Sequence, residues 1–359
     1  MTGLFDPFTC KNLHLRNRIV MAPMTRSSSP SGIPGEAVGR YYRRRAEGEV
    51  GFIITEGMGI RRPGSLNDAG SPVLYGAAVE KWARVVEEVH DAGAPIAAQL
   101  WHVGARPREG FGTLPLGEPD SPSGLPWPGM TVGKPMTEAA IADTIAAYAE
   151  AAGNATVAGF DAVEIHGAHG YLIDQFFWDK TNLRTDGWGG ATLADRAGFA
   201  VAVIRAVRDA LGPDVALLLR VSQDKSPDGS IRLTNSPQEM ESWLAPLVDA
   251  GVDILHCSGL RNSRQEFYGS DLNFAGWAKK LTGLPTISVG SVGLQRPGFD
   301  GSIPPASLDD VLRRLDRGDY DLIAVGRALI ADPAWPRKIK EGRREDLRSF
   351  SAEAMATLD

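Results

Sequence analysis

The sequence contains little of what metal clusters, disulfide scaffolds and membrane proteins require. Cys10 and Cys257 are its only cysteines, too few for a disulfide framework, a zinc site or an iron–sulfur cluster. No apolar run is long enough to span a bilayer, and the amino terminus has no apolar core of a signal peptide. We therefore expect a cytoplasmic protein that has no metal site and no membrane contact.

An excess of basic charge is also missing. The net charge is −6 and the pI is near 5.6, so no positive field attracts nucleic acid or anionic lipid. Hydrophobic residues make up 43% of the chain and charged residues 23%, as in an ordered globular protein. The expected partner is a small molecule.

Short β-rich runs alternate with amphipathic helical runs along the chain, which indicates a parallel sheet wrapped by helices. The strand candidates are 18–22, 51–55, 96–100, 162–165, 215–221, 253–256, 286–289 and 322–325. The helix candidates are 35–47, 79–92, 138–158, 193–211, 237–250, 275–281 and 308–317, and a last one follows Pro333. Eight such units favour an α/β fold of the (β/α)8 TIM-barrel type over an open sheet. We expect a single domain over residues 1–359.

Two segments do not follow this alternation. Residues 1–16 are predicted to form an N-terminal hairpin that closes the bottom of the barrel. Residues 103–136, rich in proline and glycine, form a long insertion after the third strand. Long insertions in compact domains are often functional, so a lid or wall over the barrel mouth is one interpretation. A tolerated surface loop is the other.

Two histidines and a tyrosine follow the fourth strand candidate, within the stretch DAVEIHGAHGY. Catalytic groups of a barrel lie at the carboxyl ends of its strands, so His166, His169 and Tyr171 should meet there. Two N–H donors and a phenol suit a substrate oxygen and a nearby proton acceptor. The alternative is a pair of loop histidines between turn-forming glycines.

Other strand ends carry groups that suit a flat ligand. Pro23 and Thr25 follow the first strand, and Gly57 follows the second, where a missing side chain would let a planar group approach the backbone. Gln99 and Trp101 alternate to the same side of the third strand, as for a planar heterocycle. Core packing of the indole is the alternative.

Positive charge appears at two further strand ends. Arg220 interrupts an apolar fifth strand, so it should face an anion, an electron-rich ligand or a structural ion pair. The seventh strand continues into Gly290 and Ser291, and the eighth into Gly326 and Arg327. Glycine N–H groups and an arginine after strands seven and eight are typical of a phosphate site in barrels.

Together these residues resemble the Old Yellow Enzyme family of FMN-dependent NAD(P)H ene-reductases. The resemblance is carried by NRIVMAPMTR (17–26), QLWH (99–102), HGAHGY (166–171), NLRTDGWGG (182–190), LRVS (219–222), VGSVG (289–293) and AVGRALIADP (324–333), in the family's order. Threonine at position 25 resembles one branch of the family, whereas another usually has cysteine there. The larger relatives with an iron–sulfur cluster differ, since this sequence lacks their four cysteines.

The resemblance implies non-covalent FMN within a TIM barrel. Thr25 would contact flavin O4, Gln99 would bond the pyrimidine edge, and Arg220 would face N1 and O2. The isoalloxazine plane would be lined by Pro23, Met24 and Gly57. The phosphate would be held by Gly290, Ser291, Gly326 and Arg327.

The resemblance also implies a ping-pong reaction in which NADH or NADPH reduces the flavin. Flavin N5 would then pass hydride to the β-carbon of an α,β-unsaturated carbonyl compound. His166 and His169 would hold the carbonyl oxygen, Tyr171 would protonate the α-carbon, and Trp101 would form part of the substrate wall. Both a monomer and a homodimer suit this branch.

Three alternatives stay open. The same site could denitrate nitrate esters or reduce nitroaromatic compounds. A flavin-free barrel lyase or aldolase could bind a phosphorylated substrate at Arg220 and Arg327, although no lysine is placed at a strand end for it. A flavin-binding module without turnover is the third.

Overall fold

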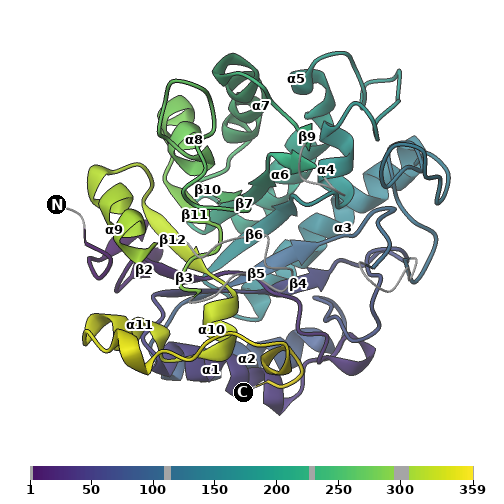
Figure 1. Ribbon diagram of the computed structural model, residues 1–359. Coiled ribbons are helices and arrows are strands. Elements are labelled where there is room, and N and C mark those ends of the chain that lie inside the picture. Colours follow the sequence, from purple (N-terminus) through teal and green to yellow (C-terminus); the bar gives the residue numbers. More distant parts are fainter. Residues whose placement is uncertain (1–2, 109–114, 226–230, 295–306, 359) are drawn as a thin grey trace.

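Eight parallel strands close into a barrel surrounded by helices (Figure 1), in the order β10-β11-β12-β3-β4-β5-β6-β7. The computed structural model describes all residues except 1–2, 109–114, 226–230, 295–306 and 359. The barrel strands are β3 (Ile19–Met21), β4 (Phe52–Gly59), β5 (Ile96–Trp101), β6 (Ala162–Gly167), β7 (Ala216–Ser222), β10 (Ile254–Ser258), β11 (Thr286–Val289) and β12 (Leu322–Val325). The predicted TIM barrel is thus confirmed.

Each barrel strand contributes one residue to a buried layer near the bottom of the barrel. This layer consists of Val20, Phe52, Ala97, Ala162, Ala216, Ile254, Ile287 and Leu322. Because side chains alternate along a strand, the next inward positions carry Gln99 on β5 and Glu164 on β6. Arg220 and His256 follow on β7 and β10. The apolar layer therefore supports a polar one nearer the carboxyl ends.

A β-bulge in β4 decides which side chain of that strand faces inward. Ile54 pairs with Ala97, but Gly57 and not Glu56 pairs with Gln99. The extra residue turns Glu56 out of the pocket lining and aims Gly57 into it, as bulges commonly do near active sites.

The N-terminal hairpin consists of β1 (Phe8–Cys10) and β2 (Leu13–Leu15). Leu13 and Leu15 are buried against the bottom layer of the barrel, and Asn12 bonds the start of β7 through the main chain of Asp214 and Ala216. The hairpin therefore covers the amino-terminal ends of the strands. Residues 1–2 of the predicted segment lie outside the described residues.

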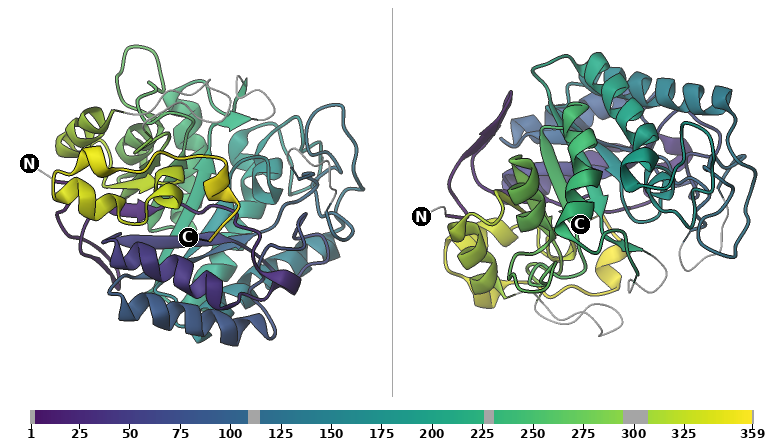
Figure 2. Two further views of the ribbon diagram at one scale, coloured as in Figure 1. Left: turned by 60° about the horizontal axis from the view of Figure 1, so that its bottom comes forward. Right: turned by 90° about the horizontal axis from the view of Figure 1, so that it is seen from above.

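Helices surround the barrel, as the two further views in Figure 2 show from other sides. They are α1 (Glu36–Glu47), α2 (Ala78–Asp91), α3 (Glu138–Val157), α4 (Leu172–Phe177), α5 (Leu193–Arg196), α6 (Gly198–Leu211), α7 (Pro237–Asp249), α8 (Phe274–Thr282), α9 (Leu308–Arg317), α10 (Arg327–Ala331) and α11 (Trp335–Lys340). Short additional pieces are η1 (Pro30–Gly32), β8 (Asp224–Lys225), β9 (Ile231–Arg232), η2 (Arg344–Asp346) and η3 (Glu353–Met355). In the described part of the chain, no helix has the length and apolar character needed to cross a bilayer.

The limits of one predicted helix and one predicted strand differ from the structure, and two short helices were missed. The helix predicted over 193–211 is two helices, because a capping box at Thr192 and Asp195 starts the short α5 and the chain turns at Ala197. The short helices α4 and α10 were not predicted. The strand predicted over 162–165 continues to Gly167 as β6, so His166 is the penultimate residue of its carboxyl end.

The insertion after β5 has neither helix nor strand in its described parts, 103–108 and 115–136. A partly buried ion pair anchors it, since Asp120 accepts hydrogen bonds from Arg62 Nε at 2.8 Å and Arg62 Nη2 at 2.9 Å. Asp120 also lies 3.0 Å from His102 Nε2 at the end of β5. Residues 109–114 of this predicted lid lie outside the described residues.

Candidate active site

The pocket at the carboxyl ends of β3 to β7 has a volume of about 140 Å³ and is lined by Pro23, Thr25, Gly57, Gln99, Trp101, His166, His169, Tyr171 and Arg220. These residues come from separate strand ends and were all predicted as site residues. Of the described residues predicted for the site, Met24, Gly290, Ser291, Gly326 and Arg327 are not part of this lining.

Four aromatic rings form one wall of the pocket by edge-to-face contacts. The ring centroids of His166 and His169 are 5.2 Å apart, and those of His166 and Tyr171 are 4.9 Å apart. Tyr171 also contacts Trp101 at 5.1 Å. This packing fixes the directions in which the imidazoles and the phenol face, which a site needs if their polar atoms are to act together.

Burial, followed by the positive charge of Arg220, holds the pKa of His166 and of His169 well below the ordinary value. Both imidazoles are therefore neutral near pH 7 and carry one N–H each. The N–H of Ala168 donates to His166 Nδ1 at 3.3 Å, so the proton of His166 is on Nε2. His166 Nε2 is thus a hydrogen-bond donor.

His169 is held by two serines. Its main-chain φ is +62°, a left-handed conformation that is uncommon for a side-chain-bearing residue, and its N–H donates to Ser222 Oγ at 3.0 Å. Its Nε2 lies 2.8 Å from Ser258 Oγ, which also accepts from Arg220 Nη2 at 3.3 Å. Since arginine cannot accept, the Ser258 hydroxyl hydrogen is available to His169 Nε2.

The loop that carries Tyr171 is tied down by a buried ion pair. Asp174 accepts from the Gly170 N–H at 2.7 Å and pairs with Lys225, and both charged side chains are only 1% exposed. Gln175 Nε2 donates to Gly170 O at 2.8 Å. Tyr171 itself is the residue before α4, so helix and ion pair together position its ring.

Arg106 contributes a cation beside these aromatic groups. Its guanidinium lies 5.4 Å from the centroid of the Tyr171 ring and donates to the main-chain oxygen of His169. Arg106 comes from the insertion after β5, so this segment contributes to the wall around Tyr171.

The floor of the pocket leaves no room for a side chain at Gly57. A Cβ there would lie 2.9 Å from the Trp101 indole, so glycine is needed for the packing of Trp101 as well as for a flat approach from the pocket. Next to it, Gln99 Nε2 donates to Glu164 Oε1 at 2.7 Å, and Glu164 Oε2 lies 2.7 Å from His256 Nδ1. Gln99 therefore lies on the floor of the pocket, and its side-chain amide is fixed by the hydrogen bond to Glu164.

Arg220 is buried, and its Nε has no hydrogen-bond partner. Burial lowers the pKa of Arg220, while Glu164 opposes this shift. Because Arg220 is a largely buried cation that lines the pocket, an electron-rich group is expected beside it there. The electron-rich N1 and O2 edge of a flavin fits this donor, and the bare backbone at Gly57 fits its plane.

The residues predicted for the phosphate lie at the ends of the adjacent strands β11 and β12. Gly290 has φ +152°, and a Cβ there would lie 2.7 Å from the Asn262 nitrogen, so only glycine is accommodated. Ser291 follows with φ +56°. Gly326 and Arg327 lie at the start of α10, with the Arg327 guanidinium 5.9 Å from the Phe350 ring centroid.

Some site residues were missed in the sequence. Glu164 and His256 are charged or polar residues within apolar strands, the same signal that singled out Arg220, and could have been found by it. Ser258 ends β10 and could have been found by its position at the carboxyl end of a strand. Arg106 had no such signal, because it reaches the site from an insertion whose path only the tertiary structure defines.

Comparison with known proteins assigns the chain to a class. A sequence model of the NADH:flavin oxidoreductase / NADH oxidase family matches residues 3–346, so the chain belongs to this family of flavin-dependent oxidoreductases. This confirms the resemblance to the Old Yellow Enzyme family and the prediction of FMN with NADH or NADPH as cofactors.

Among similar proteins, an NADH oxidase of Thermoanaerobacter brockii is 35% identical over 360 residues, which are 96% of this chain and 52% of that protein. The chain thus spans about half the length of that relative. An NADPH dehydrogenase of Clostridium acetobutylicum is 34% identical over 333 residues, 92% of each chain. An Old Yellow Enzyme homologue from Zymomonas mobilis has a similar structure, with a TM-score of 0.81, 28% identity and 99% of both chains covered.

Proposed function

We propose that this protein is an ene-reductase that uses NADH or NADPH to reduce the C=C bond of α,β-unsaturated carbonyl compounds. The observation that carries the proposal is the cluster of His166, His169 and Tyr171 around one pocket beside Arg220. When bound, FMN supplies the hydride chemistry between the nicotinamide and the substrate's β-carbon.

The two histidines hold the substrate carbonyl oxygen. His166 donates through Nε2, since Nδ1 is occupied by the Ala168 N–H. With the Ser258 hydroxyl donating to His169 Nε2, the proton of His169 lies on Nδ1, which then donates to the same oxygen. Neutral donors placed in a buried pocket stabilise negative charge that develops on a carbonyl oxygen as the β-carbon is reduced.

Tyr171 delivers the proton to the α-carbon. Its ring packs against His166 and Trp101, and the ion pair of Asp174 and Lys225 holds the loop before it. Arg106 lies beside the ring and stabilises negative charge on the phenol oxygen after the proton has left. Positioning and charge both support the role of general acid.

Arg220, Gln99 and Thr25 would hold the flavin ring, and Pro23, Met24 and Gly57 would line its plane. Gly290, Ser291, Gly326 and Arg327 would hold the phosphate from the ends of β11 and β12. An arginine and exposed backbone N–H groups form charge-assisted bonds to phosphate oxygens.

The proposal is tested by stopped-flow absorbance on protein loaded with FMN. NADH or NADPH should bleach the bound flavin, and an enone such as cyclohexenone should restore its colour with formation of the saturated ketone. Protein that is reduced but is reoxidised only by nitrate esters or nitroaromatics would refute the ene-reductase assignment. Protein that binds no FMN would refute the proposed cofactor site.

A further inference from the structure

A carboxylate with no exposed surface lies directly behind the pocket. Glu164 is on β6, one inward position before His166, and is not part of the pocket lining. Its Oε1 accepts a hydrogen bond from Gln99 on β5, and its Oε2 lies 2.7 Å from His256 Nδ1 on β10. Burying an ionised carboxylate is costly, so we expect Glu164 to have a role that compensates for this cost.

The carboxylate determines how its two neighbours are oriented. A carboxylate only accepts hydrogen bonds, so the Gln99 amide has to turn its NH2 group toward Glu164. The amide oxygen of Gln99 is then the group left to accept from the pocket that Gln99 lines. In the same way the His256 proton has to lie on Nδ1, facing Glu164 Oε2.

The resulting polarity of the pocket matches one edge of a flavin. Gln99 on β5 provides an acceptor, while Arg220 on β7 and Thr25 after β3 provide donors. The pyrimidine edge of an isoalloxazine has the opposite order, an N3–H donor between two carbonyl acceptors. An amide oxygen facing the pocket therefore suits N3–H, whereas a flipped amide would place two donors together.

We propose that Glu164 is a positioning residue that orients the Gln99 amide, so that the pocket selects a flavin with a hydrogen on N3. This rests on the proposed placement of FMN in the pocket. Glu164 also places a negative charge near Arg220, which weakens the ability of Arg220 to stabilise added negative charge on the ligand.

The test compares FMN with 3-deaza-FMN, in which C–H replaces N3–H without a change of shape. Apoprotein is titrated with each flavin by fluorescence quenching. The wild type should bind FMN about tenfold or more tightly than 3-deaza-FMN, because the analogue leaves the Gln99 oxygen unpaired. In Glu164→Gln the Gln99 amide can turn round, so the preference should fall to about threefold or less. An unchanged preference would overturn the proposal.

Two further variants distinguish an effect on the orientation of the Gln99 amide from a general effect on folding of the protein. Glu56→Gln removes another buried carboxyl group, whose Oε2 accepts from the N–H groups of Arg26 and Ser27 and whose Oε1 has no hydrogen-bond partner, so the preference should stay as in the wild type. Glu164→Asp keeps the negative charge, but its shorter side chain moves the carboxylate away from the Gln99 amide. This variant replaces Glu164→Gln in the test if Glu164→Gln does not fold. A preference retained in Glu164→Asp would also overturn the proposal.

The reduction potential gives an independent readout. Loss of the negative charge in Glu164→Gln should raise the two-electron midpoint potential by about 30 mV, a tenfold change in the relative affinity for reduced and oxidised flavin. Glu164→Asp should show little change. If the wild type fails to bind FMN, the proposed cofactor site is refuted. If the wild type binds FMN but Glu164→Gln has the same flavin preference and reduction potential, only the role of Glu164 is refuted.

Discussion

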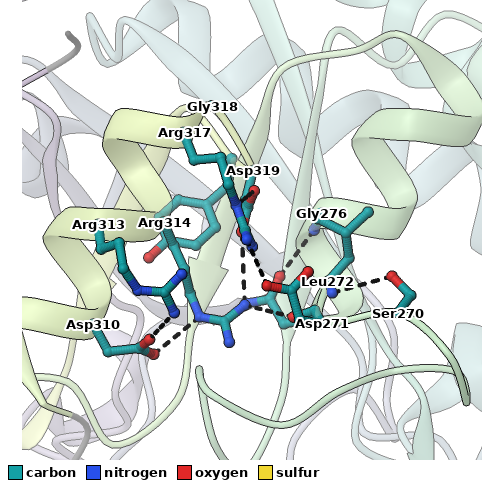
Figure 3. A network of polar contacts seen from close by, with 12 residues as sticks. Ser270, Asp271, Leu272, Gly276, Asp310, Arg313, Arg314, Arg317, Gly318 and Asp319 are labelled. Atoms are coloured by element: carbon teal, nitrogen blue, oxygen red, sulfur yellow. Dashed lines mark hydrogen bonds and ion pairs between the residues drawn. The ribbon is translucent and has the colours of Figure 1, made fainter.

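Two ion-pair networks of this protein join aspartates to a basic side chain, and their basic side chains differ in burial. At the barrel mouth, Asp174 pairs with Lys225, and each side chain is 1% exposed. On the outer surface, Arg317 of α9 pairs with Asp271 and Asp319 (Figure 3), and the Arg317 side chain is 39% exposed. Both networks pair a cation with aspartate, but the cation is buried in one and partly exposed in the other.

The difference shows where ionic contacts determine structure in this fold. Water competes for the charges of an exposed pair and screens them, so such a pair adds little stability. In a buried pair each ion has lost its water, and removal of one partner leaves the other charge uncompensated. The mouth pair therefore orders the Tyr171 loop, while the α9 network only fastens the loop after β10 to the surface.

The largest effect is expected from Lys225→Met. It leaves Asp174 buried and unpaired, which should lower the free energy of unfolding by about 3–5 kcal/mol. Urea denaturation followed by circular dichroism measures it. The double variant Asp174→Asn with Lys225→Met should regain part of the loss, since no charge is left alone. If Lys225→Met proves no less stable than Arg317→Ala, burial does not distinguish the two networks.

Tyr171→Phe tests the chemical role of the mouth. Without the phenol proton, reoxidation of the reduced enzyme by an enone should slow by about 100-fold or more, while reduction by NAD(P)H keeps its rate. Stopped-flow measurement of the two half-reactions separates these steps. Arg317→Ala is the matched surface control and should leave both rates unchanged. Equal slowing of both half-reactions in Tyr171→Phe would rule out the proton-donor role.

The buried histidines of the interior should make stability depend on pH. Burial lowers the pKa of His102, His166, His169 and His256 from the ordinary 6.5. Below pH 6.5 the unfolded chain takes up protons that the folded chain does not, so stability falls as pH falls, by up to about 1.4 kcal/mol per pH unit for each histidine.

Glu56 acts in the opposite sense. Burial raises its pKa from 4.5 to about 7, so the folded chain binds the extra proton between these values and gains stability as pH falls. One such group does not offset the four histidines whose pKa is lowered. The Tm of the apoprotein should therefore drop between about pH 7 and about pH 5.5. Arg317→Ala should show the same slope, and a flat Tm would contradict the assignment of neutral buried histidines.

The smallest effect is expected from Arg317→Ala. It should cost no more than about 1 kcal/mol, and the difference should vanish in about 1 M salt. Asp319 keeps Arg314 Nη1 at 3.6 Å, so the buried carboxylate is not left without a cation. Denaturation at low and high salt measures this. A larger loss that persists in salt would show that the network acts as a buried one.

Much of the fold could be predicted because its signals are local. Runs such as 286–289 and 322–325 are apolar and short, and the structure has strands with these bounds. The limits of β6 could not be predicted, because strand pairing depends on contacts that are distant in the sequence. The break at Ala197 could not be predicted either, because helix capping depends on contacts within a single turn. The length of a strand is decided by the neighbour it pairs with.

The sequence alone determined the barrel, the family and the residue types at the strand ends, since alternation and motif order are properties of the chain itself. Only the tertiary structure decided which of these side chains meet. The bulge in β4 makes Gly57, and not Glu56, face the pocket. The packing of β5, β6 and β10 places Glu164 between Gln99 and His256. Arg106 reaches Tyr171 from a loop that is distant in the sequence. Register and loop paths arise from packing over the whole barrel, so no local pattern contains them.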